Sequence, residues 1–175
     1  MPEYARQVRR GVTLLVTGDQ ADLTFTQEAT APTGVHPCPL DAGDLRTAAT
    51  HASRLERDPH GNLPLPLLRV HAPSEVFVFD RSAAESVSGI RSIPFARVPR
   101  KLAGLIGDGV LAGVASGAVV SATGDAASLA KLRADIADHL SQAGFHVYLD
   151  IPGWTVTDAG VAEGSDGGSA KHSAA

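Results

Sequence analysis

The segment from Gly117 to Trp154 constrains the fold more than any other part of this 175-residue chain. An apolar stretch is followed by a short polar loop and then by a stretch with apolar residues at every third or fourth position. After a glycine, the segment ends in a stretch where apolar and polar residues alternate. Periods of 3.6 and 2 residues are those of an amphipathic helix and of a strand with one buried face. The segment therefore predicts a strand–helix–strand unit.

The helix of this unit is predicted over residues 126–143. Asp125 is a suitable N-cap, and Gly144 stands where a left-handed residue commonly ends a helix. Alternation over residues 145–151 then predicts a strand with one core face. The apolar stripe of the helix consists of Leu129, Leu132, Ile136 and Leu140.

Other segments predict further strands. Residues 11–28 indicate a β-hairpin with one buried face. Residues 63–70 are extended, and two prolines keep their first half out of a central strand. Residues 75–79 (EVFVF) carry the densest β signal in the chain. Residues 90–98 indicate an edge strand or a loop, and residues 109–120 favour two short strands over one glycine-rich helix.

Two more helices and one loop are predicted. Residues 41–57 carry a small apolar stripe, with Asp41 or Asp44 as the N-cap. Residues 100–106 indicate a short helix. Residues 30–39 contain three prolines and a glycine, and predict a loop because proline cannot donate to a strand ladder.

These elements predict a single compact α+β domain over residues 11–156, with two amphipathic helices packed on a mixed β-sheet. A length of 175 residues fits one domain. Residues 1–10 form a polar N-terminal arm. Residues 157–175 are rich in glycine, serine and alanine, and we expect this tail to be disordered because it cannot bury a core.

Composition excludes some classes. The net charge of −4 argues against a general nucleic-acid binder, and the single cysteine, Cys38, excludes an intrachain disulfide. Residues 102–122 are long and apolar enough to suggest a membrane span, but their glycines and Asp108 argue against one. No signal sequence is recognisable, so we expect a cytoplasmic protein that does not enter a membrane. Arginine-rich, lysine-poor usage indicates a bacterial origin.

Two features predict a small-ligand site. The loop from Ser121 to Asp125 precedes a helix, so its backbone N–H groups, with the hydroxyls of Ser121 and Thr123 and the close approach allowed by Gly124, suit a phosphate or carboxylate. Asp80 follows an apolar strand, where many α/β enzymes place a functional carboxylate. The alternative interpretation is two ordinary capped turns, since no phosphate-loop motif is present.

The densest group of basic residues lies between positions 91 and 101. It suits a nucleic-acid backbone or an acidic partner. The alternative interpretation is a charged strand edge that resists pairing with other chains. The group consists of Arg91, Arg97, Arg100 and Lys101.

Candidate metal ligands are scattered, and their spacing matches no zinc motif. No nucleophile motif is recognisable either, so the sequence predicts no particular reaction, no metal and no cofactor. The ligands considered are His36, Cys38, His51, His60 and His71.

Three functions follow from these features. The favoured one is a non-catalytic intracellular binding or assembly module that recognises a protein partner or a second copy of itself. The first alternative is a phosphate- or nucleotide-binding protein or enzyme that uses the loop at 121–125 and Asp80. The second is a DNA- or RNA-binding accessory protein that uses the basic group at 91–101.

Overall fold

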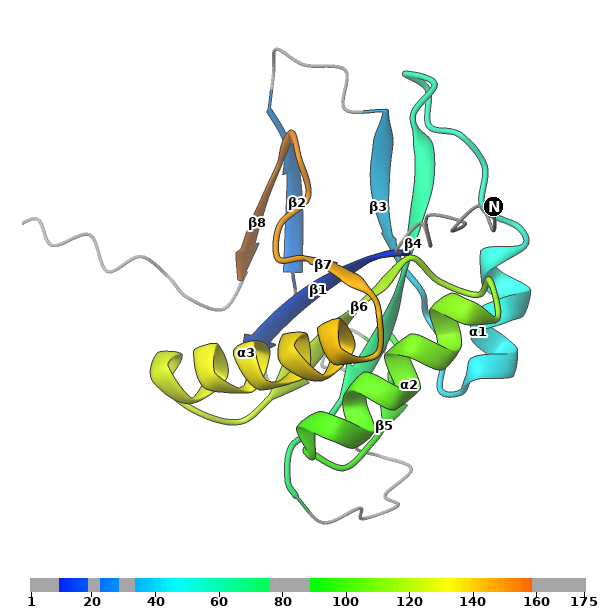
Figure 1. Ribbon diagram of the computed structural model, residues 1–175. Coiled ribbons are helices and arrows are strands. Elements are labelled where there is room, and N and C mark those ends of the chain that lie inside the picture. The colour runs from blue at the N-terminus through cyan, green and yellow to red at the C-terminus, as the bar shows by residue number, and fades with distance from the viewer. Residues whose placement is uncertain (1–9, 19–22, 29–33, 76–88, 159–175) are drawn as a thin grey trace, which may run out of the picture.

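The computed structural model describes residues 10–18, 23–28, 34–75 and 89–158. The helices are α1 (Leu45–Ala52), α2 (Pro99–Leu111) and α3 (Ala126–Gln142). The strands are β1 (Gly11–Gly18), β2 (Leu23–Gln27), β3 (Val35–Pro39), β4 (Leu63–His71), β5 (Ile93–Pro94), β6 (Gly117–Ala122), β7 (His146–Tyr148) and β8 (Trp154–Asp158) (Figure 1).

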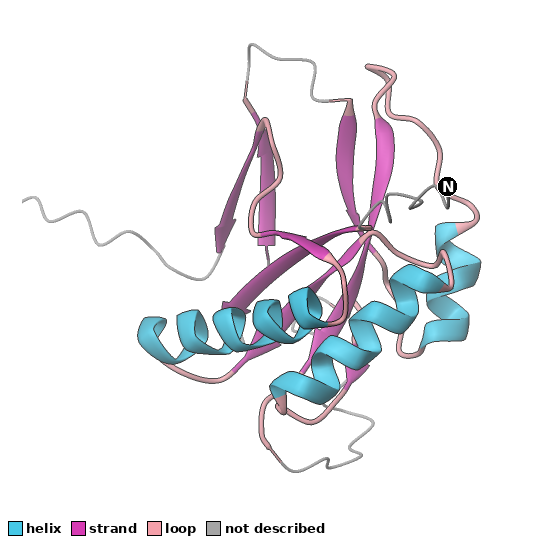
Figure 2. Cartoon of the chain, in the orientation of Figure 1, coloured by secondary structure: helices cyan, strands magenta, loops and turns pink. Residues whose placement is uncertain are grey.

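The described elements form three layers around one parallel sheet. Its strand order is β3-β4-β6-β1-β7, with β5 beside β4, and every pair in it is parallel. The helices lie on one face of the sheet, and β2 and β8 form an antiparallel ribbon on the other (Figure 2). The expected single compact domain of helices and strands is confirmed, with antiparallel pairing confined to the ribbon.

The predicted hairpin over residues 11–28 is wrong in its pairing. Both strands form, but β1 pairs with β6 and β7 while β2 pairs with β8. The reason is that β1 is buried on both faces: Val12 and Leu14 contact the helix layer, whereas Leu15 packs beneath the ribbon. A strand buried on both faces belongs inside a parallel sheet, where helices and other elements cover it.

The prediction that a strand begins near residue 109 is also wrong. Helix α2 continues through Gly107 and Gly109 to Leu111. Both glycines face neighbouring elements: a Cβ at Gly107 would lie 3.1 Å from the Phe145 ring, and one at Gly109 would lie 2.8 Å from Leu68 Cδ1. Close packing of helix on sheet therefore outweighs the low helix propensity of glycine.

The apolar residues 102–122 are thus divided between α2 and β6, with a turn between them. Among the described residues, no helix is both long and apolar enough to cross a membrane.

Part of the segment predicted as a proline-rich loop is strand β3. The Leu40 N–H donates to the Leu67 carbonyl, and the Leu63 N–H donates to the Gly34 carbonyl, both at 2.8 Å. The backbone groups of the even-numbered residues of β3 therefore form the hydrogen bonds to β4. Pro37 and Pro39 occupy odd positions, where an N–H would point away from β4, so an edge strand accommodates them.

The prolines of β4 fit the prediction made for them. Pro64 and Pro66 lie in the first half of the strand, in register with β3. Only the second half, from Leu67 to His71, pairs with β6. This half carries no proline, so it can form ladders on both sides.

Several element bounds differ from expectation. Helix α3 forms as predicted, whereas α1 covers only Leu45–Ala52 of the expected 41–57, with Asp44 as its N-cap. Strand β7 covers only three residues of the expected 145–151, and β8 forms beyond it. Of the strand expected at 75–79, all but Glu75 lies outside the described residues, as do residues 1–9 and 159–175.

Acid is expected to destabilise the helix N-termini. Hydrogen bonds from the Thr47 and Ser128 N–H groups lower the pKa of Asp44 and of Asp125 below the usual value. A carboxylate with a lowered folded pKa stabilises fully above its unfolded pKa, about 3.9, and this contribution disappears as pH falls through the folded pKa. Thermal melts of the wild type and of the double variant Asp44→Asn/Asp125→Asn should converge as pH falls from about 5 to about 2, because asparagine caps without titrating.

Candidate functional site

The next described elements after β1 and β6 lie on opposite faces of the sheet. After β6 the chain enters α3, in the helix layer. After β1 it continues to β2, whose Leu23 and Phe25 pack on the other face. Adjacent parallel strands with diverging loops open a crevice at their carboxyl ends, and ligands of open α/β sheets bind at such points. In this chain the carboxyl ends of the two strands are Gly18 and Ala122, which are in register.

A row of polar side chains crosses three strands at this edge. Ser121 is in register with both Thr17 and His71. Their side chains point to the ribbon face, because Val70 and Val120, one position earlier, face the helices. The Ser121 hydroxyl lies 3.1 Å from His71 Nδ1 and 3.4 Å from the Val70 carbonyl oxygen.

The loop after β6 is fastened by Arg97. The guanidinium Nη1 of Arg97 donates to the Thr123 carbonyl at 2.6 Å. The backbone N–H of Arg97 donates to the Ser74 carbonyl at 2.7 Å, which ties the arginine to the segment that follows β4. Guanidinium has five N–H donors in a planar fork, so this bond leaves donors that can reach a ligand.

Asp125 has a structural role at the start of α3. Its Oδ1 accepts a hydrogen bond of 2.8 Å from the Ser128 N–H, and this bond lowers the pKa of the carboxyl. The carboxylate is therefore charged at neutral pH and occupies the helix N-terminus. An anionic ligand would meet repulsion there, so the loop alone does not make a phosphate site.

A groove of about 580 Å³ opens on the helix side of the edge. Arg97, Thr123 and Gly124 line one part of it, and Leu129 and Leu132 of α3 form an apolar wall. Its volume lies within the range of about 300–1,000 Å³ that is usual for small-molecule sites. Glu75, Lys131 and Asp135 also line it, and Lys131 is paired with Asp135 at 2.7 Å.

The predicted ligand residues divide between the two sides of the edge. Thr123 and Gly124 line the groove, whereas Ser121 faces the ribbon side and contacts His71. Asp80 lies outside the described residues. Sequence reasoning missed the contact between His71 and Ser121 and the position of Thr17 in the same row, since both depend on the register of strands that are distant in the chain.

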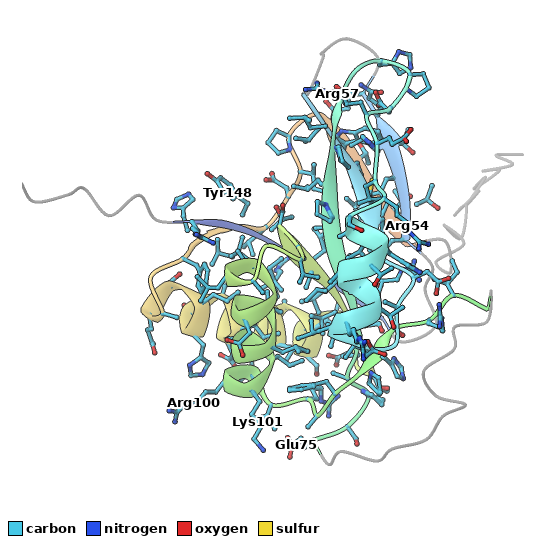
Figure 3. All side chains as sticks on the ribbon, turned by 90° about the vertical axis from the view of Figure 1, so that its right-hand side faces the viewer. Arg54, Arg57, Glu75, Arg100, Lys101 and Tyr148 are labelled. Atoms are coloured by element: carbon cyan, nitrogen blue, oxygen red, sulfur yellow. The ribbon has the colours of Figure 1, made fainter. Side chains whose placement is uncertain are left out.

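The basic residues predicted as one group at 91–101 make different contacts. Arg91 contacts Asp41, with the Arg91 N–H donating at 2.7 Å. Arg97 faces the groove. Arg100 and Lys101 are exposed at the start of α2, at the same end of the molecule as Glu75 (Figure 3).

His36 and Cys38 are neighbours on β3. The Cys38 Sγ lies 3.2 Å from His36 Nδ1. Burial raises the pKa of the Cys38 thiol, which keeps it protonated and a poor metal ligand at neutral pH. Within the ranges that the structure describes, no three His, Cys, Asp or Glu residues gather as a metal site.

Comparison with known proteins adds no functional assignment. No protein-family model matches the sequence, and neither a curated protein nor a solved structure is significantly similar to it.

Proposed function

We propose that this chain is a binding module for a small organic anion, with a phosphate or carboxylate group held at the carboxyl edge of the sheet. The observation that carries the proposal is a groove of about 580 Å³ at the carboxyl end of β6, in a parallel sheet where β2 and α3, the next described elements after β1 and β6, lie on opposite faces. Geometry of this kind recurs where α/β proteins bind small ligands.

Arg97 supplies the anion contact in this proposal. It is fixed at its backbone by Ser74 and at its side chain by the Thr123 carbonyl, so little side-chain freedom is lost on binding. The lowered pKa of Asp125 keeps that carboxyl charged at the N-terminus of α3, which directs the anionic group to Arg97 instead.

The apolar wall and Glu75 restrict the rest of the ligand. Leu129 and Leu132 offer a surface for a flat or aliphatic body. Lys131 is already paired with Asp135, whereas Glu75 can accept a hydrogen bond from an amino group. An adenine nucleotide has all three parts: a phosphate, a flat ring and an amino group. Nucleotides are therefore the first ligands to test.

Thermal shift with AMP, ATP and inorganic phosphate tests the proposal. A ligand that binds only the folded protein raises stability by RT ln(1 + [L]/Kd). We expect a nucleotide to stabilise the wild type and Arg97→Ala to weaken its affinity roughly tenfold or more, since a charge-assisted hydrogen bond contributes about 1.5–3 kcal/mol.

Arg54→Ala is the matched control, because Arg54 is exposed just after α1 and does not line the groove. It removes the same charge and should leave affinity unchanged. Absence of any shift with ligand at about 1 mM, the weak end of specific binding, would contradict the proposal. An equal loss of nucleotide affinity in Arg97→Ala and Arg54→Ala would also contradict the proposal, because it would mean that the nucleotide binds by nonspecific charge attraction.

A further inference from the structure

Strand β1 is longer than the strand that covers its outer edge. β7 pairs only with Gly11, Val12 and Thr13, whereas β1 continues to Gly18. Among the described residues, no strand lies beside Leu14–Gly18 on that side. The backbone groups of alternate residues along this stretch therefore face the place where a next strand would lie.

A cavity of about 330 Å³ lies at this place. Leu15 and Val16 both line it. Consecutive residues of a strand point to opposite faces of a sheet, so a cavity that both residues line must lie at the edge of the strand. Leu149 and Asp150, which directly follow β7, line it as well, so the cavity continues the line of β7. We call it the edge slot.

The two side walls of the edge slot differ in chemistry. On the ribbon side Leu23, Trp154 and Val156 form an apolar wall together with Leu15. On the helix side Arg133 of α3 is exposed, and no described residue forms an ion pair with it. The exposed Asp150, two residues after β7, is the other charged residue of the lining. Side chains of an inserted strand would alternate between these walls.

We propose that the edge slot binds an extended peptide of a partner protein, in which acidic and apolar residues alternate. The peptide adds a strand in line with β7, the mode in which exposed sheet edges bind peptides. It hydrogen-bonds to the backbone of Leu14, Val16 and Gly18, on the side of β1 where no described strand lies beside them. Its apolar side chains contact the wall around Trp154, and its acidic side chains face Arg133. This binding is independent of the groove beside Arg97, which lies on the opposite flank of α3.

A peptide suits the edge slot better than a second copy of this chain. The slot is bounded by α3 on one side and by the ribbon on the other. A single extended segment has the width of one strand, about 4.8 Å. The edge strand β3 of a second copy carries prolines at two of its five positions, which weakens it as a pairing partner.

Fluorescence of Trp154, the single tryptophan of the chain, reports binding directly. We expect the blocked hexapeptide Glu-Val-Glu-Val-Glu-Val to change the emission with saturation below about 1 mM. Two peptides of related composition serve as controls: Glu-Glu-Glu-Val-Val-Val, which lacks the alternation, and Lys-Val-Lys-Val-Lys-Val, which has the opposite charge. Neither should saturate.

Arg133→Glu should reverse the charge preference. We expect at least a tenfold loss of affinity for the Glu-Val peptide and a gain for the Lys-Val peptide, because like charges placed together repel and opposite charges attract. Arg54→Glu makes the same change in net charge away from the slot and should alter neither affinity. Arg133 is exposed, so this variant should fold.

Three outcomes would overturn the proposal. The first is no saturable change with the Glu-Val peptide, and the second is equal binding of the non-alternating peptide. The third is self-association, measured by light scattering, that Arg133→Glu abolishes while no peptide binds; the slot would then belong to a second copy.

Discussion

Replacing Gly117 with alanine is expected to destabilise the protein by more than about 3 kcal/mol, or to prevent folding altogether. A Cβ built on Gly117 lies 2.7 Å from the carbonyl carbon of Thr13 and 2.8 Å from its nitrogen. These are backbone atoms of the adjacent central strand, so no side chain can rotate to relieve the overlap. The pair β1–β6 would have to separate at the centre of the sheet.

Urea denaturation followed by circular dichroism measures this effect. Gly104→Ala is the matched control, because a Cβ at Gly104 meets nothing within 4 Å and the residue is exposed within α2. The free energy of unfolding of Gly104→Ala should rise by up to about 1 kcal/mol, because alanine has a higher helix propensity than glycine. A Gly117→Ala protein with the wild-type unfolding midpoint would show that the two strands do not approach as described.

Replacing Trp154 with alanine is expected to lower the free energy of unfolding by about 3 kcal/mol. This value is at the lower end of the range for large aromatic residues, because Trp154 is only half-buried. Trp154 belongs to the small core beneath the ribbon, with Leu15, Leu67 and Val119. Its indole N–H also donates to the Val35 carbonyl at 2.9 Å. A two-stranded ribbon has little stability of its own in water, so this core holds the ribbon on the sheet.

Trp154→Phe separates packing from hydrogen bonding. It retains an aromatic ring and loses the bond to Val35, so we expect a loss of about 1 kcal/mol. Denaturation by urea, followed by circular dichroism, compares the two variants. Equal stability of Trp154→Ala and the wild type would mean that the ribbon is held by other contacts.

Local signals predicted the elements whose partners are close in the chain. Helix α3, its cap Asp125 and the left-handed Gly144 follow from periodicity and capping rules. The same rules did not predict the length of α2, because Gly107 and Gly109 are explained only by their neighbours Phe145 and Leu68. Tertiary packing decides at such positions, and single-residue propensity does not.

Strand pairing was beyond local reasoning. The apolar run in β1 fits a hairpin strand and a buried parallel strand equally well. Which of the two β1 becomes depends on its pairing with β6 and β7, strands that lie more than 90 residues later in the sequence. Once β1 lies between them, Thr17, Ser121 and His71 share a row that no sequence spacing reveals.

The candidate groove was predicted in part. Thr123 and Gly124 follow from their place in a loop before a helix, and both line the groove. The sequence marks Arg97 only as one of several basic residues. Its contact with the Thr123 carbonyl depends on β5 bringing residues 93–97 beside the end of β4.

The strand order also has a consequence for synthesis on the ribosome. Thr13 pairs with Gly117, and Leu23 pairs with Asp158, so the first strands made find their neighbours only among the last. The nascent chain must carry an unpaired, apolar β1 until nearly the whole domain has emerged. Contacts so distant in sequence slow folding and leave apolar strands exposed to aggregation. Newly made chains should therefore depend on chaperones far more than the finished protein does.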